Sequence, residues 1–235
     1  MTVAKRQFRF GHAIPITRDE KPSPEAAMKL YYSTGTCSFA AHIVAREAGI
    51  PIELVLVNIH KTPHLTANGD DFSKINPKGY VPALRLGDGS VLSEGAVIAQ
   101  YLADLNPESG LMPPAGTLER YRVQSWLNFI ATELHKMFSP WMFHAEYGPA
   151  IQQVARDKIG NRLAHVEEHL AEQGPFLMGQ QFTTADAYLF TIAGWSAFAK
   201  IDLTPFPNLR SYMERIGSRP KVQEALAAER MKPAA

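Results

Sequence analysis

Apolar and polar positions in residues 28–57 predict two strands with a helix between them. Met28 to Tyr32 is a short aromatic run, and Ile52 to Val57 is dense in residues that favour strands. Between these runs apolar residues recur every three or four positions up to Gly49, which is the pattern of an amphipathic helix and its C-terminal stop. The recurring residues are Phe39, Ala40, Ile43, Val44 and Ala48. Because a helix connects the two strands, we expect them to pair in parallel as a β-α-β unit.

A hairpin and a second helix are expected next. Two short apolar runs flank Asp88-Gly89, a dipeptide typical of a hairpin turn, and Pro82 stands at the start of the first run. The apolar spacing then predicts a helix over 96–105, with Ser93 as its N-cap. The backbone N–H groups at the start of this helix can hold a carboxylate, and Glu94 can attract an ammonium group.

The rest of the chain is predicted to be helical. Residues 107–117 are rich in proline and glycine, which is typical of a linker. The spacing of apolar residues predicts one helix over 118–138 and another over 159–170. Thr183 and Asp186 have the spacing of a capping box, and the apolar residues that follow predict a buried central helix.

Two folded domains follow from this order of elements. Residues 28–106 form the first, 107–117 the linker and 118–235 an all-helical second domain. Residues 1–27 are polar, contain scattered prolines and lack the apolar segment of a secretory signal, so we expect a disordered extension. The sequence leaves open whether it is a functional arm or the product of an upstream start codon.

Composition narrows the classes of function. Apolar residues make up 46% of the 235-residue chain and charged residues 20%, with a formal net charge of +1, so neither nucleic acid nor an anionic membrane is implied as a partner. No apolar run approaches the roughly 20 residues needed to cross a bilayer. Without a secretory signal, we expect a cytoplasmic protein.

Metal binding is not predicted. A single cysteine excludes an intrachain disulfide and a multi-cysteine zinc site. His60 and His64 lie in a polar loop without a third ligand. His165 and His169 match a His-x-x-Glu-His zinc pattern by letter only, on a Glu-rich face.

Cys37, the single cysteine, stands where the first predicted strand gives way to the first predicted helix. In the first turn of a helix, unpaired backbone N–H groups and the helix dipole favour a thiolate, which is the nucleophilic form of cysteine. The alternative is a buried, unreactive cysteine that acts as a small apolar side chain. Reactive thiols are found at such corners, so we expect Cys37 to carry the chemistry.

Several motifs resemble those of the glutathione transferases. In the first domain, Asn76-Pro77-Lys78-Gly79, Val81-Pro82-Ala83-Leu84 and Ser93-Glu94-Gly95 are similar to the family's glutathione-binding signature. In the second, residues 126–136 resemble its histidine-bearing helix, and Phe182-Thr183-Thr184-Ala185-Asp186 resembles its folding motif. A cysteine in the first turn, in place of serine or tyrosine, is typical of the bacterial beta class. The resemblance covers about residues 28–228.

This resemblance implies an enzyme with an α/β thioredoxin-like N-terminal domain, an all-α C-terminal domain, a cis peptide before Pro82, a homodimer and glutathione as a substrate. It assigns Cys37 and His135 to catalysis. The implied glutathione-binding residues are Tyr32, Lys61, Val81, Pro82, Glu94, Gly95, Asn128 and Lys136. Two departures weaken individual assignments: the loop around Lys61 is less rich in lysine than in the family, and Gly95 offers only its backbone where many members have a serine.

Phe138 and Trp141 belong to a break rich in large apolar side chains. Such side chains line pockets for apolar ligands, so we expect them to form a wall for the co-substrate, an apolar electrophile or a disulfide. The alternative is simple packing at a helix end.

The predicted activity is conjugation of glutathione to electrophilic small molecules, a detoxification reaction. Cys37 makes thiol–disulfide exchange or peroxide reduction equally plausible, because a cysteine beside bound glutathione can form a mixed disulfide with it. Two alternatives stay open: a non-catalytic binding module of the same fold, and a specialised glutathione-dependent isomerase or dehalogenase.

Overall fold

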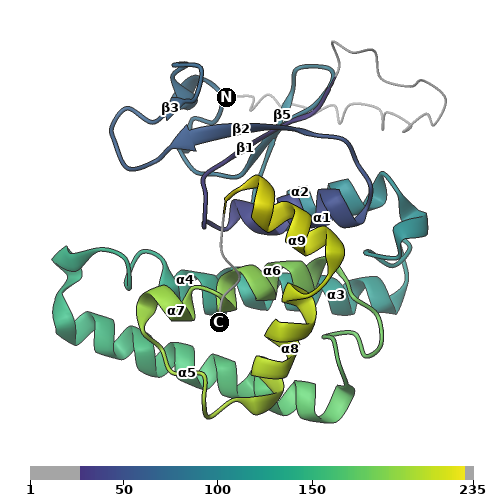
Figure 1. The fold of residues 1–235 in the computed structure, drawn as a ribbon, viewed down its shortest axis with the longest axis vertical. Coiled ribbons are helices and arrows are strands. Elements are labelled where there is room, and N and C mark those ends of the chain that lie inside the picture. The colour runs from purple at the N-terminus through teal and green to yellow at the C-terminus, as the bar shows by residue number, and fades with distance from the viewer. Residues whose placement is uncertain (1–26, 231–235) are drawn as a thin grey trace, which may run out of the picture.

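The structure, a computed structural model, describes residues 27–230. Residues 1–26, which make up nearly all of the predicted extension, lie outside this range, as do residues 231–235. The described chain forms a small sheet domain stacked on a larger helical domain (Figure 1).

The first domain is built on a five-stranded mixed sheet of order β3-β2-β1-β4-β5. The predicted β-α-β unit is confirmed, because β1 and β2 pair in parallel with Tyr31 opposite Val55. The predicted hairpin is confirmed as well, with β4 and β5 antiparallel around the turn at residues 86–90. The strands are β1 (Lys29–Tyr32), β2 (Glu53–Asn58), β3 (Leu65–Thr66), β4 (Ala83–Arg85) and β5 (Val91–Ser93).

Two helices, α1 (Ser38–Glu47) and α2 (Gly95–Asp104), pack side by side between the sheet and the second domain (Figure 1). Successive residues of a strand face opposite sides of a sheet. Leu30 accordingly joins the core beneath α1 and α2, whereas Tyr31 joins a smaller cluster on the other face with Phe72, from the 3₁₀ turn Phe72–Lys74.

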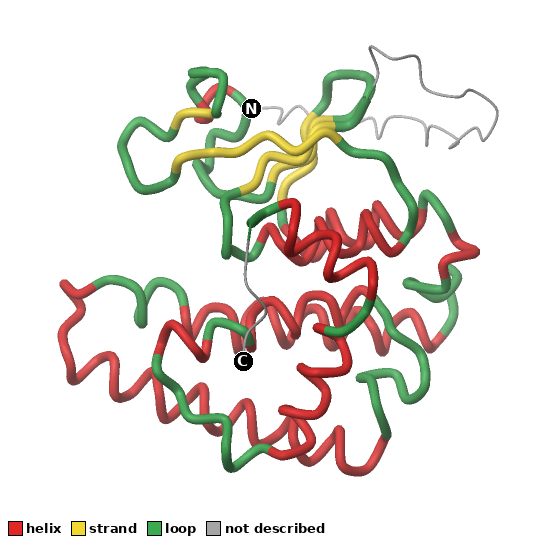
Figure 2. Tube along the Cα trace, viewed as in Figure 1, coloured by secondary structure: helices red, strands yellow, loops and turns green. Residues whose placement is uncertain are grey.

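Within residues 27–230, all strands lie in the first domain, and the second domain is helical apart from its turns, loops and two isolated β-bridges (Figure 2). Its centre is α6, in which every residue is buried, as the apolar sequence after Asp186 predicts. The predicted linker contributes to the core through Leu111 and Met112, which are both buried. The elements are α3 (Leu118–Phe129), η4 (Ile130–His135), α4 (Lys136–Phe138), α5 (Gly148–Gln173), α6 (Thr184–Ala193), α7 (Ser196–Ala199), α8 (Pro207–Gly217) and α9 (Pro220–Ala228), with 3₁₀ turns at Pro107–Ser109 and Ala145–Tyr147.

The expected single helix over 118–138 is interrupted. Residues 130–135 form a π-helical segment between α3 and α4, so one regular helix is the wrong description of its second half. A π-helix makes wider turns with i to i+5 hydrogen bonds, which shifts the face on which later side chains appear. This shift acts on His135, the last residue of the segment.

The predicted capping box at the start of α6 is confirmed. The Thr183 backbone N–H donates to Asp186 Oδ2 at 2.7 Å, and the Thr183 hydroxyl donates to the same oxygen at 2.9 Å. The other oxygen, Oδ1, accepts from the Leu177 N–H at 2.8 Å and from the Tyr212 hydroxyl at 3.1 Å. The carboxyl group of Asp186 therefore ties three segments of the helical domain together.

The two domains share one continuous apolar core. Helix α1 contacts α6 and α9 of the helical domain as well as the sheet, so the helix that follows Cys37 is also the main contact between domains. Among residues 27–230, no helix combines the length and the apolar character that crossing a membrane would require.

Candidate active site

Cys37 is the N-cap residue of α1, directly after the turn that follows β1. Two hydroxyl groups close this turn. Thr36 Oγ1 donates to the Ser33 carbonyl oxygen at 2.8 Å, and Ser38 Oγ donates to the same oxygen at 3.2 Å. The small polar residues of the turn thus hold Cys37 one position before the first helical residue.

The thiol of Cys37 is a hydrogen-bond donor in this structure. Its Sγ lies 3.3 Å from the carbonyl oxygen of Val81, which precedes the cis peptide at Pro82 and the start of β4. Burial raises the pKa of Cys37 to about 11, although the backbone at the helix start and the charge of Lys136 act to lower it. The prediction of a thiolate favoured by the helix N-terminus is therefore wrong for this structure, because desolvation outweighs the helix.

Alkylation of Cys37 by iodoacetamide is expected to accelerate about tenfold for each pH unit between pH 7 and 10, because only the thiolate reacts and most of the thiol stays protonated. Since Cys37 is the single cysteine, the total rate reports on this residue alone. The protein unfolded in urea serves as the control, with a plateau near the ordinary thiol pKa. A plateau below pH 8 in the folded protein would contradict the raised pKa.

His135 faces the second domain's central helix. Its Nδ1 lies 2.8 Å from the hydroxyl of Tyr188 on α6, and its ring packs edge-on against Trp195 at 5.0 Å between centroids. Burial, with a smaller effect of Lys136, lowers the pKa of His135 to about 4. The imidazole is therefore uncharged at neutral pH and supplies no positive charge to the site.

Lys136 supplies positive charge to the site. Its ammonium nitrogen lies 6.0 Å from the centroid of the Tyr80 ring, so the side chain reaches from α4 to the segment just before Val81. Its charge lowers the pKa of both Cys37 and His135. Lys136 is exposed, which leaves its ammonium group accessible to an anionic ligand.

The start of α2 differs from the prediction. Glu94, not Ser93, is the N-cap residue, with a backbone φ of 71° that is unusual for a residue other than glycine. The Ser93 hydroxyl instead accepts from the Lys78 ammonium at 3.2 Å, and the same ammonium pairs with Glu94 Oε1 at 2.6 Å. Because no side chain caps this helix, its first backbone N–H groups stay available to an anion.

Known proteins similar to this chain share its two-domain organisation. Residues 34–105 match the family description "Glutathione S-transferase, N-terminal domain", and residues 129–220 match "Glutathione S-transferase, C-terminal domain". The chain is 43% identical over 205 residues to the glutathione S-transferase GstA of Escherichia coli O157:H7, an alignment that covers 87% of this chain and 100% of the relative. The chain belongs to the glutathione S-transferase family.

Solved structures agree with this assignment. A glutathione transferase from Methylococcus capsulatus str. Bath superposes with a TM-score of 0.83 at 53% identity, covering 86% of this chain and 98% of that one. A bacterial beta class glutathione S-transferase from Sphingomonas chungbukensis superposes with a TM-score of 0.81 at 40% identity, covering 86% and 98%. The predicted resemblance to the bacterial beta class is confirmed.

In this glutathione S-transferase fold, the predicted site residues fall into two groups. Val81 contacts the Cys37 thiol directly, and the charges of Lys136 and Glu94 act on its pKa. His135 is connected to this group through its contacts with Tyr188 and Trp195. Other predicted residues stand apart from these contacts. Lys61 lies in an exposed loop, and the side chain of Asn128 is exposed on α3.

Gly95 lies against Pro82. A β-carbon added at Gly95 would lie 3.5 Å from Pro82 Cγ, which is an ordinary contact distance. The space at this position therefore accommodates a β-carbon, so packing against Pro82 does not require glycine.

The aromatic residues expected to form a co-substrate wall occupy different positions. Phe138 is fully buried and packs against Trp195 at 6.0 Å between ring centroids, so its ring is not exposed to a ligand. This position fits the alternative of helix-end packing better. Trp141 is partly exposed and packs against Tyr147 at 4.9 Å.

The sequence analysis did not predict two residues that contact the site, Trp195 and Tyr188. Trp195 donates from Nε1 to the Gly35 carbonyl oxygen at 2.8 Å, so it holds the turn that carries Cys37. The Tyr188 hydroxyl is hydrogen-bonded to His135 Nδ1. Burial raises the pKa of Tyr188, and the charges of Cys37 and Glu94 contribute to this rise. Both lie in the apolar stretch expected to be a buried helix, where nothing in the local pattern distinguishes them from packing residues.

The histidines of the His-x-x-Glu-His pattern pack against Trp126. The His165 ring stacks on it at 5.8 Å, and the His169 ring lies edge-on at 4.6 Å. His169 Nε2 also lies 2.9 Å from the carbonyl oxygen of Leu177. Within residues 27–230, no group of three histidine, cysteine or carboxylate residues could hold a metal ion.

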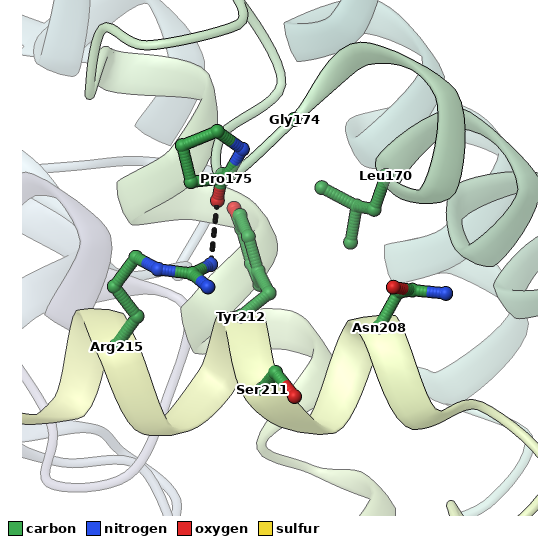
Figure 3. Close-up of a pocket in the computed structure, with 7 residues that line it drawn as sticks. All are labelled: Leu170, Gly174, Pro175, Asn208, Ser211, Tyr212 and Arg215. Carbon is green, nitrogen blue, oxygen red and sulfur yellow. Dashed lines mark hydrogen bonds between the residues drawn. The ribbon is translucent and has the colours of Figure 1, made fainter.

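A surface pocket of about 270 Å³ lies between the end of α5 and α8 (Figure 3). In Figure 3 the Arg215 guanidinium points at the Pro175 carbonyl oxygen, to which it donates at 2.9 Å. None of the seven residues that line the pocket was predicted for the glutathione site. They are Leu170, Gly174, Pro175, Asn208, Ser211, Tyr212 and Arg215.

Proposed function

We propose that this protein is a glutathione transferase that binds glutathione at the start of α1, where the two domains meet. The observation that carries this proposal is that groups from separate segments meet at Cys37. The thiol donates to the Val81 carbonyl oxygen, and the charges of Lys136 and Glu94 act on the pKa of that thiol. A thiol, a free backbone segment and fixed charges of both signs suit a zwitterionic thiol tripeptide such as glutathione.

The proposed binding mode follows from the chemistry of each group. The γ-glutamyl end of glutathione carries an ammonium and a carboxylate. Glu94 would attract the ammonium, and the uncapped backbone N–H groups of α2 at Gly95 would hold the carboxylate. The backbone of Val81 would pair with the cysteinyl unit, which brings the thiol of glutathione towards Cys37. Tyr32, Lys61, Pro82, Asn128 and Lys136 are the other proposed contacts.

Two reactions are proposed at this position. In conjugation, the thiolate of glutathione attacks an electrophilic carbon and displaces a leaving group. In exchange, the Cys37 thiolate attacks oxidised glutathione, a Cys37–glutathione disulfide forms and one reduced glutathione leaves. Both reactions need negative charge on sulfur. Lys136 can stabilise that charge, whereas the uncharged His135 can contribute a hydrogen bond but no positive charge.

Binding of glutathione would also change the surroundings of Cys37. The Val81 carbonyl, which accepts the Cys37 thiol, belongs to the same backbone segment that is proposed to pair with glutathione. Competition for this carbonyl would free the thiol at the time when its reaction partner arrives. This arrangement limits exchange chemistry to the bound complex.

The expected homodimer is part of the same proposal. Val97 on α2 and Leu118 and Tyr121 on α3 are 44%, 60% and 60% exposed, although all three are large apolar side chains. The two helices are tied to each other by a hydrogen bond from Gln124 to Gln100 at 2.8 Å. Together they offer a surface on which a second copy would bury apolar area. The roles in detoxification and in the cytoplasm stay predictions.

Native mass spectrometry tests the proposed function. After incubation with oxidised glutathione, we expect one glutathione adduct per chain, removed by a reductant, on a particle of two chains. Glutathione should also raise the unfolding temperature, because it binds only the folded protein. No adduct on Cys37 and no shift in the unfolding temperature would favour the non-catalytic binding module.

A further inference from the structure

The pocket between α5 and α8 stands apart from the proposed glutathione site. Helix α1, which begins after Cys37, packs on α6, and α8 packs on α6 and on α5. Figure 1 shows α5 and α8 on the side of the helical domain that is turned away from the sheet. A ligand in this pocket therefore need not displace glutathione bound near Cys37.

One face of α8 supplies the polar side of the pocket. Asn208, Ser211 and Arg215 follow one another at intervals of three and four residues, so their side chains lie on the same face of the helix. Figure 3 shows them in order along α8. All three are exposed. This face therefore offers a ligand one positive charge and two neutral polar groups.

The guanidinium of Arg215 is held in place and keeps donors for a ligand. Its Nη1 donates to the Pro175 carbonyl oxygen at 2.9 Å (Figure 3). Within residues 27–230, this carbonyl is the group that the side chain bonds, and no carboxylate forms an ion pair with it. Since a guanidinium carries five N–H donors, several remain available. Arginine binds a carboxylate through two parallel hydrogen bonds, so Arg215 suits a ligand of this kind.

The opposite end of the pocket disfavours an anion. There the carboxylate of Glu167 caps the start of α8: Oε1 accepts from the backbone N–H of Asn208 at 3.0 Å and from its side-chain amide at 2.7 Å. The other oxygen, Oε2, accepts from the Leu209 N–H at 2.8 Å. Because the helix start is already occupied by a negative charge, a carboxylate ligand is expected to place its charge at Arg215 and its uncharged end towards Asn208.

Apolar groups form the other wall of the pocket. Leu170 on α5, Pro175 and the ring of Tyr212 line it. Leu170 and Tyr212 are 5% and 0% exposed, and the Tyr212 hydroxyl donates to Asp186 Oδ1 at 3.1 Å, which fixes the ring. The volume of about 270 Å³ lies just below the range of about 300–1,000 Å³ that is typical of pockets for drug-sized ligands. The pocket therefore suits a small, compact ligand.

We propose that this pocket binds a small carboxylic acid with a compact apolar body, such as an aromatic monocarboxylate, with its carboxylate on Arg215. One arginine balances the single charge of such a ligand. Inorganic phosphate has no apolar part, so it leaves the wall of Leu170 and Tyr212 without contact. The site goes beyond the proposed function, because binding here requires neither Cys37 nor glutathione.

An N–H correlation NMR titration of the full chain with benzoate tests the site. A ligand of this size is expected to bind with a dissociation constant of about 1 mM. We expect saturable shifts of the backbone N–H signals of Gly174, Ser211 and Arg215, which line the pocket. The indole N–H of Trp195, which donates to the Gly35 carbonyl oxygen beside Cys37, reports on the proposed glutathione site and should not shift.

Two further probes separate charge from shape. Benzamide keeps the apolar ring of benzoate but carries no charge. Inorganic phosphate carries charge but has no ring. Each should bind at least about tenfold more weakly than benzoate, because each loses either the charge-assisted hydrogen bonds or the apolar contacts.

Three variants locate the binding. Arg215→Met removes the charge with a side chain of similar shape and should weaken binding at least about tenfold. Arg210→Met, the same change at an exposed arginine of α8 outside the pocket lining, is the matched control and should stay within about twofold. Because Arg215→Met also loses the bond to Pro175, Ser211→Phe is the second test: it keeps Arg215, fills the pocket with a ring and should abolish binding.

Four outcomes would contradict the proposed pocket ligand. Equal weakening by Arg215→Met and Arg210→Met would mean that benzoate senses only the general surface charge. Wild-type binding to Ser211→Phe, or shifts of the Trp195 indole without those of Gly174 and Ser211, would place benzoate elsewhere. The absence of saturable shifts up to about 20 mM, about twenty times the expected constant, would exclude the site. A protein that binds benzoate here but fails to bind glutathione would contradict only the proposed function.

Discussion

Replacing Cys37 with alanine is expected to lower the rate of disulfide exchange by about 100-fold or more, while the affinity for glutathione stays within about threefold. Exchange needs a protein sulfur that forms the mixed disulfide, and Cys37 is the single cysteine of the chain. The proposed contacts of glutathione with Glu94 and with the start of α2 do not involve this sulfur, and at the Val81 carbonyl the substitution removes only a competing thiol donor. The rate is measured with a small hydroxyalkyl disulfide, and the affinity by calorimetry.

A conjugation assay also distinguishes the reacting thiol of Cys37 from the binding site for glutathione. If the thiolate of glutathione is the nucleophile, Cys37→Ala should still conjugate an aryl halide at a rate within about tenfold of the wild type. Cys37→Ser is the matched control, because its hydroxyl can still donate to the Val81 carbonyl but cannot form a disulfide. Equal losses of exchange and of glutathione affinity in Cys37→Ala would contradict the division between a reacting thiol and a separate binding site.

Replacing Asp186 with asparagine is expected to destabilise the protein by about 2–4 kcal/mol at pH 7, since each buried donor left without an acceptor costs about 1–3 kcal/mol. The two carboxylate oxygens accept four hydrogen bonds, from Leu177, from the hydroxyl of Tyr212 and twice from Thr183. An amide offers one oxygen only, so its NH2 group would face two of these donors. Urea unfolding gives the free energy.

The matched control is Asp202→Asn, the same change at an exposed carboxylate that accepts one backbone N–H from Thr204 at 2.8 Å. For Asp202→Asn we expect little change in the free energy of unfolding, because water can replace the lost contact. Equal effects of the two substitutions would contradict the role assigned to the capping box.

The pH dependence of the Asp186 effect has a defined sign. Burial raises the pKa of Asp186 from 3.8 to about 6. The folded protein therefore binds this proton more tightly than the unfolded chain does. The stability contributed by the proton is fully present below pH 3.8 and is lost as the pH rises through about 6. The difference in unfolding free energy between the wild type and Asp186→Asn is thus expected to shrink from pH 4 to pH 7.

Local patterns predicted the features that depend on neighbours in the sequence. The strand, turn and helix around Cys37 and the capping box of Thr183 and Asp186 involve residues a few positions apart, and the structure contains them. The π-helical segment before His135 was not predicted, because its apolar spacing resembles that of a regular helix.

The chemistry of the site depends on contacts that the sequence pattern does not display. The protonation of the Cys37 thiol follows from burial and from a carbonyl 44 residues away. The partner of Trp195 is 160 residues from it, and His42, the partner of Glu229, is 187 residues from it. The last two contacts join the two domains, and all three depend on the folded arrangement.

The hydrogen bond from Cys37 to Val81 has a further consequence for damage by oxidants. Peroxides attack thiolates far faster than thiols, and repeated attack carries cysteine through sulfenic acid to the irreversible sulfinic and sulfonic acids. With its pKa raised to about 11, Cys37 exposes almost no thiolate at neutral pH. The resting protein should therefore survive peroxide concentrations that inactivate enzymes with a permanently ionised cysteine, and lose this resistance only while its substrate is bound.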